Sequence, residues 1–312
     1  MLLARQAPVG VILRRGPSKQ VLMIRWDLER DTFEAGQWLK GRVYEEQCDL
    51  SPRGDLLIYC AAKHTGEDDG TWTAISRPPY FTALALWPLD GTWQGGGGIF
   101  LSGTQVVLSH IEPEPELAAG SSLPPWLMVS PDIALNIAST ASIFTEHRRY
   151  WDGWHLVEKK AAIEGSAVDI KDLWVKRWPR YSPSVLLRVR NQIDGRGVHP
   201  QIYELQGDSG VISLGAADWA DWCPSGDLLL AREGRIYRIG NRIGNHGHPE
   251  SDGFVRELID LSPLQFAERE APPEAREWEG PLPAGSPLPL STQPADAPDL
   301  QTEALRSMLA RL

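Results

Sequence analysis

The residues best suited to binding lie between His147 and His155. This stretch combines two histidines, two arginines and three aromatic side chains around Gly153. Arginine, tyrosine and tryptophan are the residue types that most often dominate the energetics of protein interfaces. The sequence therefore nominates a binding site made of Arg148, Arg149, Tyr150, Trp151 and Trp154. A structural alternative stays open, in which Trp154 and Trp174 pack into a core between sheets and the arginines are solvated.

Two further segments carry groups that can ligate metals. His246-Gly247-His248 is followed by Glu250 and Asp252, and imidazole and carboxylate groups are ligands for transition metals. The same composition is typical of a solvated loop, so His246 and His248 are named as candidates but no metal or other cofactor is predicted. The acidic run Glu67–Gly70 lacks the spacing of a calcium loop and is interpreted as a polar hairpin tip.

The motifs that usually mark a catalytic centre do not occur in this chain. It has no Gly-x-Ser-x-Gly, His-Glu-x-x-His or Walker sequence. The run Gly95–Gly98 has no following Lys-Ser/Thr pair, and we interpret it as a flexible turn rather than a phosphate loop. Two carboxylates supplied by separate segments would leave no local signature, so glycoside hydrolysis stays open. No catalytic residue is nominated, and the balance favours a protein without enzymatic activity.

Composition limits the partners. The 312 residues include 31 Lys and Arg against 41 Asp and Glu, which gives a net charge of -10. Binding to nucleic acid or to anionic membranes relies on basic residues that neutralise phosphates, so neither partner is expected. The three cysteines show no CxxC spacing, and no run of about 18 apolar residues or N-terminal leader pattern occurs. The default expectation is a cytoplasmic protein.

The elements that position these residues are indicated by an internal repeat. Ser51–Ile58 and Cys223–Leu230 share Pro-x-Gly-Asp-Leu-Leu followed by an aliphatic residue, and we call these two segments the repeat heads. A second pair, Asp49–Pro52 and Asp260–Pro263, is identical over four residues, and weaker copies contain Pro88, Pro131 and Pro183. The prolines recur at intervals of roughly 36 to 52 residues, about 42 on average, which is the period of a four-stranded propeller blade. Each head predicts a tight turn followed by a short strand.

The ends of the repeat predict a closed ring. The chain begins with a unit that lacks a head and ends, at Asp260–Pro263, with a head that lacks a unit. Because a ring must close its first unit against its last, we expect the N- and C-terminal segments to pair within one blade. The predicted fold class is all-β: a single β-propeller with six blades. Five blades are the alternative, if the longest interval or the Pro88 copy is misread.

The heads at 51–58 and 223–230 resemble the blade heads of TolB-like and WD-repeat-like β-propeller proteins. The resemblance covers roughly residues 8–266 and implies a propeller fold, with no implication for activity. The chain departs from WD-repeat proteins because it lacks recurrent Trp-Asp blade ends. A looser TolB-like or unclassified propeller is the preferred interpretation.

The C-terminal part has a different composition. After a propeller over 1–266, residues 267–298 are rich in proline and acidic side chains, which predicts a disordered linker. Residues 299–312 predict a short amphipathic helix whose apolar face includes Leu305, Met308, Leu309 and Leu312. A helix of this length is marginal alone, so it is expected to dock on its own propeller or on a partner.

Two functions follow from these patterns. The first is a non-catalytic propeller that acts as a protein–protein interaction platform, with a protein partner bound through the aromatic stretch or the C-terminal helix. The second is a carbohydrate-active or other hydrolytic enzyme whose site lies in the propeller funnel. It is motivated by 13 tryptophans, of which Trp72 and Trp93 are candidate sugar-stacking platforms.

Overall fold

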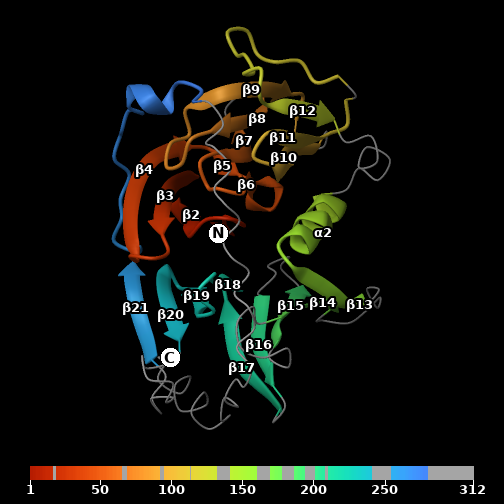
Figure 1. The fold of residues 1–312 in the computed structure, drawn as a ribbon, viewed down its shortest axis with the longest axis vertical. Helices are drawn as coiled ribbons and strands as arrows, with labels where there is room; N and C mark the ends of the chain where they lie inside the picture. The colour runs from red at the N-terminus through yellow and green to blue at the C-terminus, as the bar shows by residue number, and fades with distance from the viewer. Residues whose placement is uncertain are drawn as a thin grey trace. The chain divides into compact units, whose positions relative to one another are not determined.

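The computed structural model is an all-β structure with one α-helix among the residues that it describes (Figure 1). These residues are 1–16, 19–64, 69–91, 95–112, 114–131, 141–159, 169–177, 186–193, 201–207, 210–240 and 254–279. They divide into two compact units. Unit 1 contains residues 1–148 and takes up the chain again at Gln265, and unit 2 contains residues 149–264.

Unit 1 begins with a four-stranded antiparallel sheet in chain order, which we call sheet A. Its strands are β1 (Leu2–Leu3), β2 (Val9–Gly16), β3 (Gln20–Asp27) and β4 (Thr32–Lys40). Its two longest buried runs are the aliphatic-rich starts of β2 and β3, each with four consecutive buried residues. Asp27 ends the third strand by accepting hydrogen bonds from the backbone N–H groups of Glu29 and Arg30, both at 3.0 Å.

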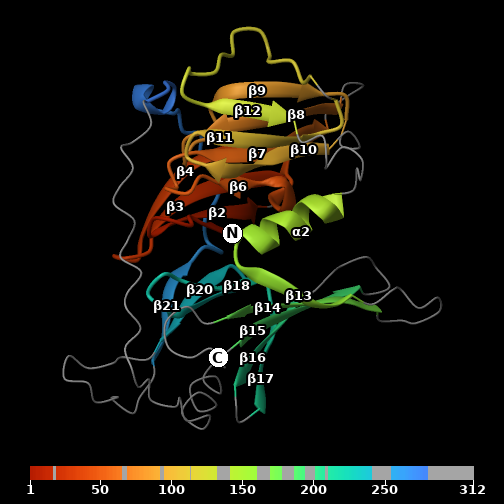
Figure 2. The same ribbon diagram turned by 45° about the vertical axis from the view of Figure 1, so that its right-hand side comes forward.

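Two more sheets complete unit 1. Sheet B is antiparallel, with a single 3-10 turn at Glu45–Gln47, and sheet C contains one parallel pair, β11 with β12. Figure 2 shows β10 of sheet C lying against β7 of sheet B. The strands of sheet B are β5 (Arg42–Val43), β6 (Asp49–Leu50), β7 (Leu57–His64), β8 (Asp69–Ser76) and β9 (Ala83–Leu89). Those of sheet C are β10 (Gly95–Ser102), β11 (Gln105–His110) and β12 (Met128–Pro131).

The glycine run is part of β10, so its interpretation as a flexible turn is wrong. The strand approaches sheet B so closely that side chains would not fit. A Cβ atom placed on Gly98 would lie 2.6 Å from Ile58 Cδ1, and one on Gly96 would lie 2.5 Å from Cys60 Sγ. Glycine is therefore required here by the close packing of β10 on side chains of β7 rather than by mobility.

Unit 2 is built from two antiparallel sheets that follow the chain order. The helix α2 (Ala141–Trp151) leads into sheet D, and its last residues, 149–151, belong to unit 2. The strands of sheet D are β13 (Trp154–Lys159), β14 (Asp169–Arg177), β15 (Leu186–Ile193), β16 (Gln201–Gly207) and β17 (Gly210–Ala217). Sheet E consists of β18 (Trp219–Trp222), β19 (Leu228–Arg232), β20 (Arg235–Gly240) and β21 (Phe254–Asp260).

The tight turn predicted in each repeat head is confirmed. One head joins β6 to β7 and the other joins β18 to β19. Gly54 and Gly226 take positive φ angles of 76° and 89°, and their N–H groups donate to the carbonyls of Ser51 and Cys223 at 2.9 and 2.8 Å. The weaker copies differ, because Pro88 lies within β9 and Pro131 is the last residue of β12. Pro183 lies outside the described residues.

The expected pairing of the two terminal segments in one sheet is not found in the described chain. The first sheet is completed by its own short strand β1, which pairs with β2 through Leu2 and Leu3. Strand β21 belongs to sheet E, where it pairs with β20. The prediction failed because β1 supplies a first strand without carrying the Pro-x-Gly-Asp turn by which heads were recognised. The described residues form five sheets.

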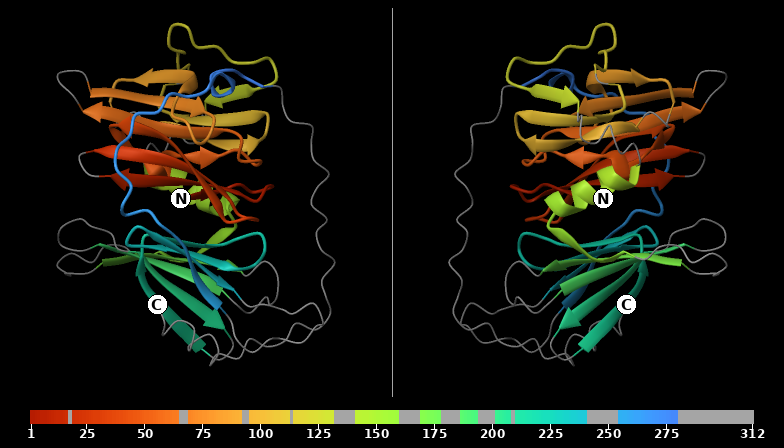
Figure 3. Two further views of the ribbon diagram at one scale, coloured as in Figure 1. Left: turned by 90° about the vertical axis from the view of Figure 1, so that its left-hand side faces the viewer. Right: turned by 90° about the vertical axis from the view of Figure 1, so that its right-hand side faces the viewer.

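Residues 265–279, which we call the strap, differ from the expected linker. They run over unit 1, as the blue segment in Figure 3 shows, with a 3-10 turn at Pro273–Ala275. Ala271 and Ala275 are each only 3% exposed. Composition alone predicts disorder here because the high content of proline and glutamate outweighs the few apolar residues, although the strap buries some of them. The predicted linker beyond residue 279 and the helix 299–312 lie outside the described residues.

Candidate functional site

The candidate site lies where α2 ends and sheet D begins. The helix stops after Trp151, and Gly153 adopts a positive φ of 84° that turns the chain into β13. The N–H of Gly153 donates to the carbonyl of Tyr150 at 3.0 Å. This turn places Tyr150 and Trp151 at a helix end, while Trp154 becomes the first residue of a strand.

Trp174 of β14 is the buried centre of the site. Its side chain is 1% exposed, and the ring of Tyr150 meets it edge-on with 5.3 Å between centroids. The guanidinium of Arg149 lies 5.1 Å from the Trp174 ring centroid, which is a cation–π contact. Arg149 and Tyr150 therefore both pack on the buried ring of Trp174.

Three large apolar side chains of this region are exposed. Tyr150, Trp151 and Val157 have exposed fractions of 46%, 52% and 61%. We call them the α2–β13 surface. Exposed hydrophobic side chains that fall singly on a surface are ordinary, but two aromatic rings beside an arginine are the composition of an interface hot spot.

A buried ion pair supports the site from sheet E. Lys176 of β14 contacts Asp221 of β18 with 2.7 Å between Nζ and Oδ1, and Lys176 Nζ also lies 5.8 Å from the ring centroid of Trp154. Burial raises the pKa of Asp221, and the charge of Lys176 opposes that rise. The Asp221 carboxylate also accepts the N–H of Trp222 at 2.7 Å. These contacts fix the strand that carries Trp174.

The five nominated binding residues have different surroundings. Tyr150 and Trp151 are exposed, and Arg149 is stacked on Trp174. Trp154 is 7% exposed and belongs to the core of unit 2, as in the structural alternative. Arg148 belongs to unit 1, where its guanidinium donates to the carbonyls of Glu45 and Cys48, both at 2.8 Å. The nominated helix residues Leu305, Met308, Leu309 and Leu312, and the metal candidates His246 and His248, lie outside the described residues.

A buried histidine in unit 1 was not singled out by the sequence. His110 is 2% exposed, and its Nε2 lies 2.8 Å from Thr73 Oγ1, which accepts the N–H of Gly97 at 2.8 Å. Burial lowers the pKa of His110 to about 4, so the ring is neutral near pH 7. His110 follows Val106 and Leu108 at a spacing of two residues on β11, so it lies on the same buried face of that strand. This spacing is the sequence signal that could have identified it.

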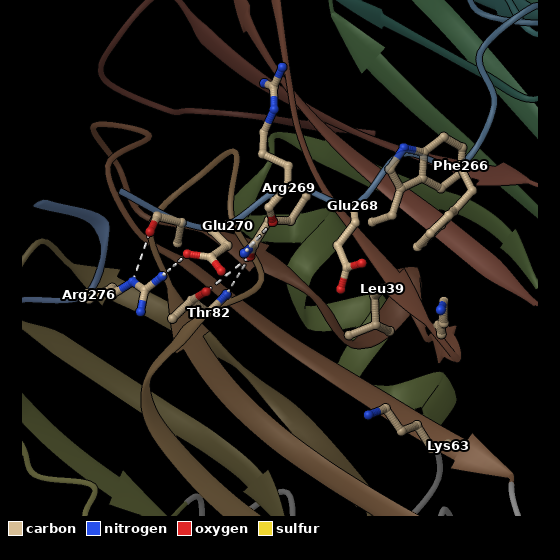
Figure 4. Close-up of a pocket in the computed structure, with 12 residues that line it drawn as sticks. Leu39, Lys63, Thr82, Phe266, Glu268, Arg269, Glu270 and Arg276 are labelled. Atoms are coloured by element: carbon tan, nitrogen blue, oxygen red, sulfur yellow. Dashed lines mark hydrogen bonds and ion pairs between the residues drawn. The ribbon is translucent and has the colours of Figure 1, made fainter. Parts of the chain in front are cut away.

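Unit 1 has an open groove of about 450 Å³ beside the strap (Figure 4). One wall is β4 and the other is the strap itself. Figure 4 shows Glu268 extending from the strap toward Leu39, with Lys63 beyond. The lining also includes the aromatic rings of Trp38 and Phe266.

The described residues offer neither a metal site nor a membrane-spanning helix. Within the described ranges, no group of three or more histidine, cysteine, aspartate or glutamate side chains is placed to hold a metal ion. No helix in this part of the chain has the length and apolar character needed to cross a membrane. Trp72, one of the two candidate sugar platforms, is half-buried against the core of sheets A and B. Trp93 lies outside the described residues.

The fold and site define an all-β protein with an exposed aromatic surface. A comparison of the chain with protein-family models gives no match, and a comparison with curated proteins gives none either.

Proposed function

We propose that this protein is a non-catalytic interaction platform that binds a protein partner through the α2–β13 surface. One observation carries the proposal: Tyr150 and Trp151 are about half exposed at a helix end where Arg149 and Tyr150 both contact the buried ring of Trp174. Rigid aromatic side chains lose little conformational entropy on binding, so they contribute more to affinity than flexible ones.

The scaffold of this platform is proposed to be a β-propeller. Support comes from the repeat heads, which form equivalent turns after the short strands β6 of sheet B and β18 of sheet E. Further support comes from the succession of five sheets along the chain, of which all but sheet C are antiparallel throughout. Five sheets in the described residues favour the five-bladed alternative over six blades. An experimentally determined structure that shows the five sheets arranged around one axis is the expected result, and an open arrangement would contradict it.

The partner proposal is tested by affinity purification with matched variants. We expect Trp151→Ala and Tyr150→Ala to weaken retention of the partner by about 10-fold or more, since removal of an aromatic hot spot costs about 2 kcal/mol or more. Val211→Ala is the control, because Val211 is 45% exposed on the distant edge strand β17 of the same sheet. Retention that is equal for wild type and all three variants would contradict the proposal.

The hydrolytic alternative stays a prediction. It requires two carboxyl groups about 5 to 9.5 Å apart in an aromatic pocket. The acidic residues at the groove of unit 1, Glu268 and Glu270, both belong to the exposed part of the strap. No observation in the described chain favours this function over binding.

A further inference from the structure

The strap contacts unit 1 in the way that an extended peptide contacts a receptor. Its first anchor is Phe266, whose ring lies 6.0 Å from that of Trp38, with the Lys40 ammonium 4.7 Å from its centroid. Its last anchor is Trp278, whose ring meets Trp126 edge-on at 5.8 Å. Two aromatic side chains thus fasten the two ends of a segment that has only one short 3-10 turn between them.

The main chain of the strap is held by polar side chains of unit 1. Gln37 donates through Nε2 to the carbonyl of Arg269 at 3.1 Å. The other end of the same amide accepts the N–H groups of Phe81 and Thr82 at 2.8 and 3.0 Å, which orients it. At the far end, the indole N–H of Trp278 donates to the carbonyl of Ser122 at 3.0 Å. The bond from Gln37 recognises the extended backbone of the strap, whereas the bond from Trp278 belongs to its aromatic anchor and adds side-chain specificity.

Charge complements these contacts. The strap contains five glutamates and two arginines. Arg77 of unit 1, which is 15% exposed, donates to the carbonyl of Glu277 at 3.1 Å and pairs with the Glu279 carboxylate at 3.2 Å. Lys40 and Lys63 line the groove beside the other end. The face that receives the strap is therefore basic where the strap is acidic.

Chain topology makes the strap separable from its receptor. Every receptor residue named above comes from residues 37–126, whereas the strap follows Leu264, after residues 149–264 of unit 2. The strap also leaves a groove of about 450 Å³ between itself and β4 unfilled. Unit 1 thus recognises a segment that is remote in sequence, and its receiving face is wider than that segment.

We propose that this face of unit 1 is a peptide-binding site that the strap occupies in cis, and that it takes in trans an acidic, proline-containing extended segment with an aromatic anchor at each end. The site is distinct from the α2–β13 surface, since every group that forms it belongs to unit 1. The cis strap acts as a competitor, because a tethered segment has an effective concentration in the millimolar range.

The test uses the full chain and a fluorescent synthetic peptide with the sequence of residues 265–279. In the double variant Phe266→Ala/Trp278→Ala the cis strap is weakened while the receptor residues stay intact. We expect the peptide to bind this variant about 10-fold or more tightly than wild type, as removal of an intramolecular competitor requires. Adding Trp126→Ala or Arg77→Ala to the double variant is expected to reverse that gain. A peptide carrying both alanines is the matched ligand control.

The outcomes separate the alternatives. Near-UV circular dichroism first checks that the double variant keeps its packing; if it does not, Trp278→Ala alone takes its place. Equal binding to wild type and a folded strap variant would overturn the proposal, as would no binding to either. Binding that Trp126→Ala and Arg77→Ala leave unchanged would also overturn it, because the peptide would then occupy another surface. Failure here leaves the partner test on Trp151 unaffected, since that variant changes a different unit.

Discussion

Each repeat head is preceded by a buried aspartate at the same point of its hairpin, but the two carboxylates have different partners in the two units. In unit 1, Asp49 of β6 is 2% exposed. Its carboxylate forms an ion pair with Arg5 at 2.8 Å and accepts the N–H of Phe100 at 2.8 Å. In unit 2, Asp221 of β18 takes Lys176 at 2.7 Å and the N–H of its own neighbour Trp222. Both carboxylates stand two residues before the head.

The difference lies in how many sheets each carboxylate joins. Arg5 follows β1 of sheet A and Phe100 belongs to β10 of sheet C, so Asp49 links three sheets of unit 1. Asp221 links only two, sheets D and E, through Lys176. The aspartate beside a similar hairpin therefore connects three sheets in unit 1 and two sheets in unit 2. The free energy of unfolding of variants that lack either aspartate is expected to show which unit depends more on this contact.

The largest effect is expected from Asp49→Ala. It leaves the guanidinium of Arg5 half-buried without this partner carboxylate and removes the acceptor of the Phe100 N–H. Breaking one side of a buried ion pair typically costs about 3 to 5 kcal/mol. Urea unfolding should show that loss in the free energy of unfolding, and a smaller loss for Asp221→Ala. Equal losses would contradict the inference that Asp49 contributes more because it connects three sheets.

Acid should weaken unit 1 through His110. The pKa of His110 is lowered to about 4 in the folded protein against an ordinary 6.5, so below pH 6.5 the unfolded chain binds a proton that the folded chain does not. Stability should therefore fall as the pH drops from 6.5 toward 4, by about 3 kcal/mol at most, since each pKa unit corresponds to about 1.4 kcal/mol. The measurement is urea unfolding across this range. His110→Gln should flatten the dependence, and an unchanged slope would contradict the assignment.

The close contacts of β10 with β7 of sheet B and with its own partner strand β11 should make Gly98 intolerant of a side chain. Gly98→Ala places a Cβ 2.6 Å from Ile58 Cδ1 and 2.6 Å from the carbonyl oxygen of Val107. Overpacking of this kind costs about 1 to 3 kcal/mol. Gly103→Ala is the control, because a Cβ there meets nothing within 4 Å. Thermal unfolding that gives the same midpoint for both variants would contradict the need for glycine in β10.

Sequence patterns predicted what depends on local chemistry. Pro52 and Gly54 fix the turn of one head, and Pro224 and Gly226 fix that of the other, so the hairpins and the all-β class were predictable. The aromatic stretch near Tyr150 was nominated because its composition is unusual, and its role in binding stays a prediction. What could not be predicted depends on distant contacts. Nothing local to Phe266 or Trp278 shows that Trp38 and Trp126 receive them.

The same limit explains the errors. A headless first unit was inferred because β1 carries no Pro-x-Gly-Asp turn, although its two residues suffice to pair with β2. The Gly95–Gly98 run suggested mobility because the strand that packs against it belongs to another sheet. The burial of His110 likewise depends on Thr73, 37 positions earlier in the chain. Tertiary contacts override local propensity at each of these positions.

The smallest effect on stability is expected from Lys176→Met in unit 2. Its pH dependence should have the opposite sign to that of His110 in unit 1. This substitution removes the cation beside Asp221 while preserving much of the apolar length of the side chain. Burial already raises the pKa of Asp221, so without Lys176 this carboxyl should take up a proton at still higher pH. Neutralisation limits the loss of stability to about 1 to 2 kcal/mol near pH 7, less than for an aspartate that stays charged.

The sign of its pH dependence is opposite to that of His110. A carboxyl whose folded pKa lies above its unfolded value binds more protons when folded, so stability falls as the pH rises through the interval between the two values. The destabilisation by Lys176→Met should therefore be smaller at acid pH and grow toward neutral pH. Urea unfolding at several pH values, with Lys176→Arg as the control that keeps the charge, measures this trend. A destabilisation that is the same at every pH would mean that Lys176 acts through packing on Trp154 rather than through Asp221.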